Sequence, residues 1–108
     1  MNILFVCSRN QWRSPTAEAI FKNSPHYAVR SAGTSDAAKV KLTSKLLEWA
    51  DLVFVMEKRH REIIDAKFIT NKQIIVLDIP DEYGYMDVEL IQMIRSSVSP
   101  WLGSNDRV

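Results

Sequence analysis

The sequence predicts an α/β protein of three layers, α/β/α, in which an open four-stranded parallel sheet carries helices on both faces. Short apolar runs alternate with longer segments of helical periodicity along the chain. The first run starts at the N-terminus and is apolar throughout, which is typical of a strand buried on both faces. A length of 108 residues, 46% of them hydrophobic, suits one domain that spans residues 1–108.

The first half of the chain predicts two strands and two helices. Residues 2–7 (NILFVC) form the buried first strand, and Pro15 suits the first turn of a helix that ends at residues 23–25. Residues 26–31 predict the second strand, and Thr43 is a good N-cap for the second helix. The helix positions expected to face the core are Ala17, Ile20, Phe21, Leu42, Leu46 and Leu47.

The second half repeats the alternation. Residues 51–56 (DLVFVM) predict a third buried strand, residues 57–68 a charged surface helix, and residues 73–79 a fourth strand. A loop rich in turn formers, residues 80–84, leads to Asp87, which can cap a last helix. The apolar positions expected to face inward from these two helices are Ile63, Ile64, Leu90, Ile91, Ile94 and Val98.

The charge balance argues against several kinds of partner. The 14 basic and 13 acidic residues are mixed along the chain and leave a net charge of +1, so no overall field indicates nucleic acid or an anionic membrane. The apolar runs are too short to span a bilayer and the N-terminus lacks a signal-peptide pattern, so we expect a cytoplasmic protein. The expected oligomeric state is a monomer or weak dimer. The polar tail, residues 103–108, is expected to fray and has no functional interpretation.

The lone cysteine, Cys7, ends the first strand, and Arg13 follows it after five residues. A loop that runs from a strand into a helix presents free N–H groups and the positive end of the helix dipole, which together suit an anion such as phosphate. The same field favours the thiolate of Cys7, the form that attacks as a nucleophile. Arg13 can donate two parallel hydrogen bonds to phosphate oxygens, and Ser14 can hydrogen-bond the sulfur. The sequence therefore predicts a phosphate-binding loop that contains its own nucleophile.

These residues resemble the low-molecular-weight protein tyrosine phosphatases. The signature of that family is a hydrophobic strand, Cys, five residues, Arg, Ser and Pro, then a small residue and Glu. The matching positions in this chain are Cys7, Arg13, Ser14, Pro15, Ala17 and Glu18, with Asn10 at the place of the loop asparagine. The likeness continues at residues 31–34 (SAGT), at residues 51–56 and at residues 80–81, so it covers nearly the whole chain.

The resemblance implies a phosphate monoester hydrolase that forms a phosphocysteine at Cys7 and needs no metal or cofactor. It implies that Asp81 is the general acid for the leaving group and then the base for water, and that Tyr83 lines the substrate cleft. The expected substrates are phosphotyrosine proteins or small aryl phosphates, with inorganic phosphate as product. The residues expected to bind the phosphate beside Arg13 are Ser8, Arg9, Asn10, Gln11, Trp12 and Ser14.

Several positions depart from the family pattern. Trp12 stands where the family has a second cysteine, so a protective disulfide is not expected, and we expect this ring at the rim of the cleft. Arg9 replaces a glycine and is expected to favour acidic or phosphate-rich substrates. Glu82 replaces the proline after the acid, which leaves Glu82 or Asp78 as a substitute acid. The segment between residues 34 and 42 is shorter than usual, so part of the cleft wall is expected to be missing.

Two other functions are compatible with the same residues. The first is a module that binds phosphate or phosphotyrosine with little turnover, which the changes at Arg9 and Glu82 and the shortened segment favour. The second is arsenate reduction, although that chemistry relays oxidation through further cysteines that this chain lacks. His26 and His60 have no partner at a recognisable spacing and are expected at the surface, with residues 58–61 as a solvated helix face.

Overall fold

Strands and helices alternate along residues 1–102, the part of the chain that the computed structural model describes. The predicted tail, residues 103–108, lies outside the described residues. The elements are β1 (Asn2–Cys7), α1 (Arg13–Phe21), β2 (Ala28–Gly33), α2 (Ser44–Trp49), β3 (Leu52–Val55), α3 (Lys58–Lys67), β4 (Ile74–Val76), α4 (Val88–Val98) and the 3-10 turn η1 (Ser99–Trp101).

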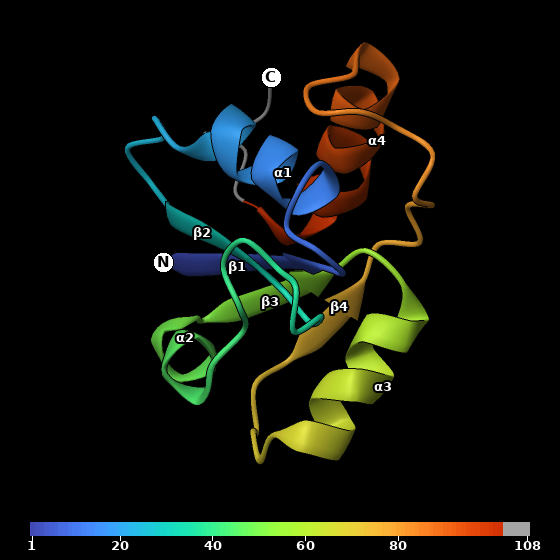
Figure 1. Cartoon of the computed structure of the whole chain (residues 1–108). Coiled ribbons are helices and arrows are strands. Elements are labelled where there is room, and N and C mark those ends of the chain that lie inside the picture. The colour runs from blue at the N-terminus through green and yellow to red at the C-terminus, as the bar shows by residue number, and fades with distance from the viewer. Residues whose placement is uncertain (103–108) are drawn as a thin grey trace.

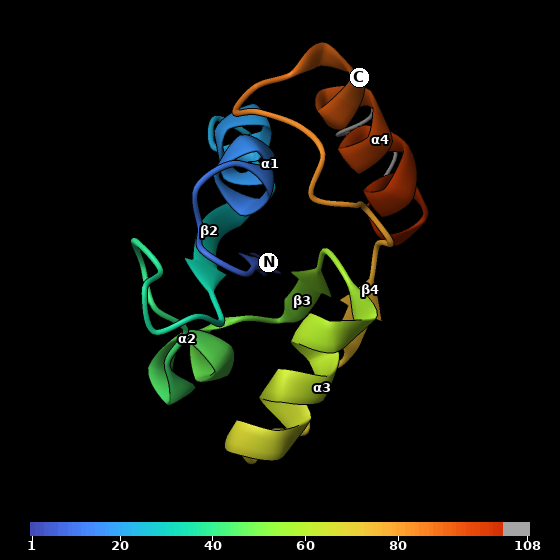
Figure 2. The same ribbon diagram turned by 45° about the vertical axis from the view of Figure 1, so that its right-hand side comes forward.

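The four strands form one parallel sheet in the order β2-β1-β3-β4. Helices α1 and α4 cover one face and α2 and α3 cover the other, as Figures 1 and 2 both show. This arrangement confirms the predicted three layers. The chain leaves β1 towards one face and β3 towards the opposite face, so the carboxyl ends of these neighbouring strands form a topological switch point. Parallel sheets of this kind bind their ligands at such a switch point.

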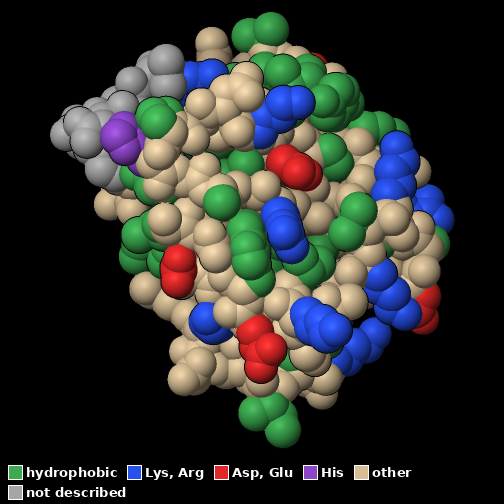
Figure 3. Space-filling model, turned by 90° about the vertical axis from the view of Figure 1, so that its left-hand side faces the viewer, with side chains coloured by type: hydrophobic (Ala, Val, Ile, Leu, Met, Phe, Trp, Pro, Cys, Tyr) green, Lys and Arg blue, Asp and Glu red, His purple; other side chains and the backbone are tan. Residues whose placement is uncertain are grey.

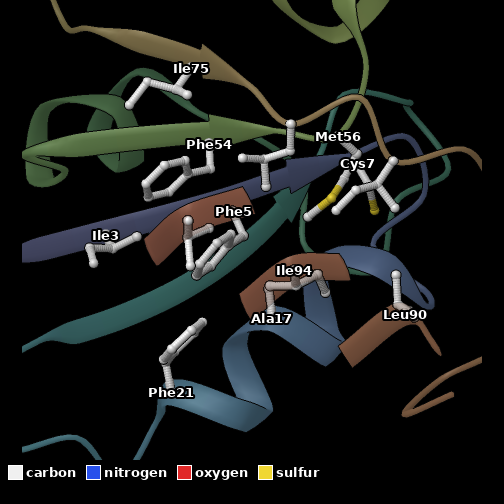
Figure 4. Close-up of a cluster of buried hydrophobic side chains, with 13 residues drawn as sticks. Ile3, Phe5, Cys7, Ala17, Phe21, Phe54, Met56, Ile75, Leu90 and Ile94 are labelled. Carbon is white, nitrogen blue, oxygen red and sulfur yellow. The ribbon is translucent and has the colours of Figure 1, made fainter. Parts of the chain in front are cut away.

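The core has two parts because β1 is buried on both faces. One cluster lies between the sheet and the helices α1 and α4, where the Phe5 ring stacks on Phe21 at 6.0 Å and on Phe54 at 5.4 Å. The alternate residues of β1, such as Leu4, face the second cluster beneath α2 and α3. Figure 4 shows Cys7 at the end of the first cluster, where β1 runs into the following loop.

The expected helix caps are present. Thr43 Oγ1 accepts a hydrogen bond from the N–H of Leu46 at the start of α2. Asp87 Oδ1 accepts from the N–H of Glu89 at the start of α4. Such caps satisfy donors that have no partner within the helix.

Three strands differ from their predicted bounds, and the third, Leu52–Val55, is shorter by one residue at each end. The second runs from Ala28 to Gly33 and not over residues 26–31, because its pairing with β1 starts where Asn2 faces Ala28 and ends where Cys7 faces Gly33. The fourth is only Ile74–Val76, because it pairs with three residues of β3 and because Asp78 takes a left-handed backbone (φ 57). A strand's extent depends on its neighbour, which the propensity of a segment does not encode.

The face at the amino ends of the strands carries acidic, basic, apolar and uncharged side chains side by side (Figure 3). Within residues 1–102, no helix combines the length and the apolar character that a membrane crossing requires.

Candidate active site

The loop between β1 and α1 lies at the switch point of the sheet and borders a pocket of about 400 Å³. The pocket brings together residues from the first loop, the loop after β2, the first turn of α3 and the loop after β4. Its lining residues are Cys7, Ser8, Arg9, Gln11, Trp12, Arg13, Ser35, Arg59 and Asp81. Cys7, Arg13 and Asp81, which are far apart in the sequence, therefore share one pocket.

The loop turns its carbonyl groups away from the pocket. The carbonyl of Cys7 accepts from Thr34 N–H at 2.9 Å, and the carbonyl of Ser8 accepts from Ser35 N–H at 2.9 Å. Among the residues that the structure describes, no protein acceptor binds the main-chain N–H groups of residues 9–14. These donors and the N-terminus of α1 are the groups with which proteins hold phosphate.

Cys7 lines this pocket, with 3% of the residue exposed. Ser14 Oγ lies 2.9 Å from Cys7 Sγ and also accepts a hydrogen bond from Asn10 Nδ2. The single hydrogen of Ser14 can go to this sulfur or to the carbonyl of Ala32, which is further away at 3.4 Å. The geometry favours the sulfur, and a hydroxyl donor at that position stabilises a thiolate.

Asn10 supports the loop from behind. Its backbone is left-handed (φ 56), a conformation that asparagine tolerates better than most residues. Its amide nitrogen also donates to Ser31 Oγ, and Ser31 donates in turn to a carboxylate oxygen of Glu18. The side chains of Asn10 and Ser14 are buried behind the loop and do not line the pocket.

Arg13 is buried, with 2% of the residue exposed, and neighbouring groups hold its guanidinium in place. Its NH1 group donates to Glu57 Oε2 and to the carbonyl of Ile79, and its Nε lies 3.7 Å from Asp81 Oδ1. Burial raises the pKa of Glu57, but hydrogen bonds from Arg59 and Arg13 and their charges outweigh it and lower that pKa to about 2. Glu57 is therefore ionised at neutral pH and balances the buried guanidinium.

Asp81 is half-exposed in the loop after β4 and lines the pocket. Asp78 lies in a separate depression with Glu57 and Pro80, and Glu82 is exposed away from the pocket lining. Of the three acids considered for the proton-transfer role, the structure places Asp81 beside Arg13.

The two aromatic residues expected at the cleft, Trp12 and Tyr83, lie in different places. Trp12 lies at the rim, 47% exposed, and lines both this pocket and a neighbouring depression to which Tyr85 contributes. Tyr83 is not among the lining residues of either, and it packs instead against the core cluster on the α1 side. The structure thus brings Trp12 to the site as expected and places Tyr83 elsewhere.

The expectation of a surface His60 was wrong, because this side chain is fully buried. Helix α3 starts at the sheet edge where β1 ends, so its first turn faces the loop. Burial, followed by the charges of Arg13 and Arg59, lowers the pKa of His60 to about 4, and Glu57 and Asp81 oppose this only in part. The imidazole is therefore neutral at pH 7.

Sequence reasoning also missed Arg59 and Ser35, both of which line the pocket. The signal for Arg59 was its position just after the third strand, which ends at the same edge as Cys7. Three arginines and one acid line the pocket, so its charge favours an anionic ligand. Within residues 1–102, no three His, Cys, Asp or Glu side chains gather in a metal-binding arrangement.

This fold and site define a class: α/β proteins with a cysteine and an arginine in an anion-binding loop at the end of a central strand. The sequence model of the low molecular weight phosphotyrosine protein phosphatases matches residues 2–43. Together with the relatives described next, this match shows that the chain is similar to the low-molecular-weight protein tyrosine phosphatases.

Two curated relatives are phosphatases with different names. A protein-arginine-phosphatase of Bacillus subtilis (strain 168) is 35% identical over 95 residues, and the match covers 63% of each chain. The low molecular weight protein-tyrosine-phosphatase PtpB of Staphylococcus aureus is 29% identical over 114 residues, which cover 78% of this chain and 82% of PtpB. The match to the arginine phosphatase spans less than two thirds of that protein's length, whereas the match to PtpB spans more.

Solved structures show the same likeness. A low molecular weight protein tyrosine phosphatase from Bacillus subtilis superposes with a TM-score of 0.75, 27% identity and full coverage of both chains. The tyrosine phosphatase Wzb from Escherichia coli K30, in complex with phosphate, has a TM-score of 0.75 and 25% identity over 93% of this chain and 94% of Wzb. A YwlE arginine phosphatase, with a phosphorylated active-site serine in place of its cysteine, has a TM-score of 0.72 and 27% identity over 99% of both chains.

Proposed function

We propose that this chain is a protein phosphatase that hydrolyses phosphate monoesters, with phosphotyrosine as its substrate class. The observation that carries the proposal is the meeting of Cys7, Arg13 and Asp81 in one pocket, bordered by a loop whose main-chain N–H groups have no protein acceptor among the described residues. A nucleophile, a fixed cation and a solvent-accessible acid are the groups that phosphoryl transfer to a side chain requires.

In the proposed reaction the Cys7 thiolate attacks phosphorus, and the bond between phosphorus and the leaving oxygen breaks. Asp81 gives its proton to that oxygen, and Arg13 with the loop N–H groups holds the charge on the phosphoryl oxygens. Water then attacks the phosphocysteine, Asp81 takes a proton from the water, and the P–S bond breaks to restore the thiolate. The net reaction consumes one water and releases inorganic phosphate.

Two substrate classes are supported to different degrees. The exposed ring of Trp12 at the rim suits an aromatic leaving group, which favours phosphotyrosine. The similarity to a protein-arginine-phosphatase makes phosphoarginine the second candidate, for which the same attack would break a P–N bond. Arg9 and Arg59 at the pocket add positive charge that suits acidic residues around either phosphorylated side chain.

We also infer a cytoplasmic location and a monomer or weak dimer. A lone nucleophilic thiol keeps its activity in a reducing compartment, which is consistent with the single cysteine. A module that binds phosphate without turnover is the alternative in the same pocket, and arsenate reduction is disfavoured because Cys7 has no second cysteine to resolve it.

The test is a set of phosphate-release assays on an aryl phosphate, a phosphotyrosine peptide, a phosphoarginine protein and a phosphoserine peptide. Cys7→Ser should abolish release and keep the binding of inorganic phosphate, because the loop donors remain. Asp81→Asn should lower kcat most for poor leaving groups, and Asp78→Asn serves as the matched control outside the pocket.

Release that persists in Cys7→Ser would contradict the covalent mechanism. A wild-type chain that binds phosphate or vanadate and releases nothing from any substrate would favour the binding module. Faster release from the phosphoarginine protein than from the phosphotyrosine peptide would move the assignment to the second substrate class.

A further inference from the structure

The first turn of α3 contacts the phosphate-binding loop at a second point besides Arg13. Ser8, the residue after the nucleophile, has its Oγ 2.8 Å from Nε2 of the buried His60. The other ring nitrogen of His60, Nδ1, lies 3.0 Å from the main-chain nitrogen of Glu57 and accepts its hydrogen. His60 therefore joins the start of α3 to the loop through both of its nitrogens.

These two contacts fix where the imidazole carries its hydrogen. A ring nitrogen that accepts a hydrogen bond has a free lone pair, so Nδ1 is unprotonated. A neutral imidazole then has its hydrogen on Nε2, and Nε2 donates to Ser8 Oγ. Protonation of Nδ1 would break its contact with Glu57 N–H and would place a cation near Arg13 and Arg59, consistent with the lowered pKa of His60.

The direction of this bond determines the direction of the Ser8 hydroxyl. Its oxygen already accepts from His60, so its one hydrogen has to point to another acceptor. Among residues 1–102, the hydrogen bonds of Ser8 Oγ include no second partner, and Ser8 lines the pocket with Cys7 and Arg13. An acceptor within this pocket, such as a bound anion, can take the hydrogen.

We propose that Ser8 donates a side-chain hydrogen bond to the bound phosphoryl group, and that buried His60 is the positioning residue that orients this hydroxyl. The inference rests on the proposed function for its substrate. It adds one side-chain donor, the Ser8 hydroxyl oriented by α3, to the main-chain donors of the loop. Helix α3 then serves the pocket at three points, because Glu57 holds Arg13, His60 holds Ser8, and Arg59 lines the wall.

The mutational test measures the affinity for inorganic phosphate and orthovanadate, together with kcat and KM for an aryl phosphate. Ser8→Ala should weaken binding of the oxyanions about tenfold or more, because a hydrogen bond to a charged group is lost. Ser8→Thr, which keeps the hydroxyl, should stay within about threefold of the wild type. His60→Phe keeps a buried ring without nitrogens and should weaken binding to a similar extent as Ser8→Ala.

The double variant separates positioning from general stability. If His60 acts through Ser8, the Ser8→Ala, His60→Phe protein should bind phosphate no more weakly than Ser8→Ala alone. Losses that add in the double variant, or a Ser8→Ala protein that binds within twofold of the wild type, overturn the proposal. His26→Phe, at an exposed histidine, is the matched control for the loss of an imidazole.

A measurement on the unmodified protein remains decisive if His60→Phe does not fold. The nitrogen-15 chemical shifts of the His60 ring at pH 7 should show hydrogen on Nε2, and that signal should move when phosphate is added. Hydrogen on Nδ1 refutes the proposed orientation. Wild-type turnover together with unchanged phosphate binding in Ser8→Ala refutes only this inference, whereas absent turnover with Ser8-dependent binding refutes only the proposed function.

Discussion

At the scale of single residues, the site depends on a buried cation that is neutralised by its neighbours. Arg13 is almost wholly enclosed, and a guanidinium in that position is tolerated only when charges and acceptors surround it. Glu57 supplies the charge and the carbonyl of Ile79 supplies an acceptor, while Asp81 lies further off at 3.7 Å. Glu57 thus holds and neutralises Arg13, although Glu57 itself does not line the pocket.

Glu57→Gln is expected to lower the free energy of unfolding by about 2 kcal/mol at pH 7, because it removes the charge opposite Arg13 and keeps the hydrogen-bond acceptor. Since the folded-state pKa of Glu57 is lowered to about 2, this contribution is present above pH 4.5 and is lost as the pH falls towards 2. Urea unfolding of the wild type and of Glu57→Gln at several pH values measures this difference in the free energy of unfolding. Glu62→Gln, on the exposed face of the same helix, is the control, and equal losses in the two variants would contradict the assignment.

At the scale of elements, the loop between β1 and α1 is shaped by the strand beside it. The loop lies directly on Gly33 at the end of β2, where an added Cβ would meet the carbonyl oxygen of Ser8 at 2.5 Å and the Cβ of Ala38 at 2.6 Å. The neighbouring carbonyls of the loop are held by N–H groups of the segment after β2. The conformation of the loop is therefore set jointly by β1, by β2 and by the segment that follows β2.

Gly33→Ala is expected to displace the loop, to lower the free energy of unfolding by about 1–3 kcal/mol and to abolish phosphate binding, because backbone atoms have to move. Calorimetry of phosphate binding and thermal unfolding together check both effects. Gly84→Ala is the matched control, since an added Cβ there meets nothing within 4 Å. Phosphate binding that survives in Gly33→Ala would show that the loop does not need this close approach.

At the scale of the whole molecule, the same groups that build the site link stability to pH. His60 is neutral in the folded protein down to about pH 4, whereas the unfolded chain takes up this proton near 6.5. Between these values the unfolded state binds more protons than the folded state, so stability rises with pH in this window. Below pH 4.5 the protonation of Glu57 in the unfolded chain adds a second loss of stability as the pH falls.

Between pH 7 and pH 4 the wild type should lose on the order of 3 kcal/mol of stability through His60 alone. His60→Gln removes the titrating ring and keeps an acceptor at a helix position where glutamine is usual. Urea unfolding at several pH values should therefore show the difference between wild type and variant shrinking as the pH falls. Parallel curves for the two proteins would contradict the burial and neutrality of His60.

The sequence by itself determined the alternation of strands and helices, and it identified the loop from Cys7 to Arg13 with its resemblance to the family, because these depend on residues close together in the chain. Apolar runs identified β1 and β3, and the caps Thr43 and Asp87 followed from local hydrogen bonding. Cys7 and Arg13 were found by the same local logic, since one loop carries both.

Only the tertiary structure decided which distant residues complete the site. The charged run at the start of α3 has the composition of a solvated face, yet the crossing at β3 places its first turn against the loop and buries His60. Tyr83 and Tyr85 lie two residues apart, and the path of the backbone sends the first to the core and the second to a depression beside Trp12. Burial and partnership arise from strand order and packing between segments, which composition and spacing do not encode.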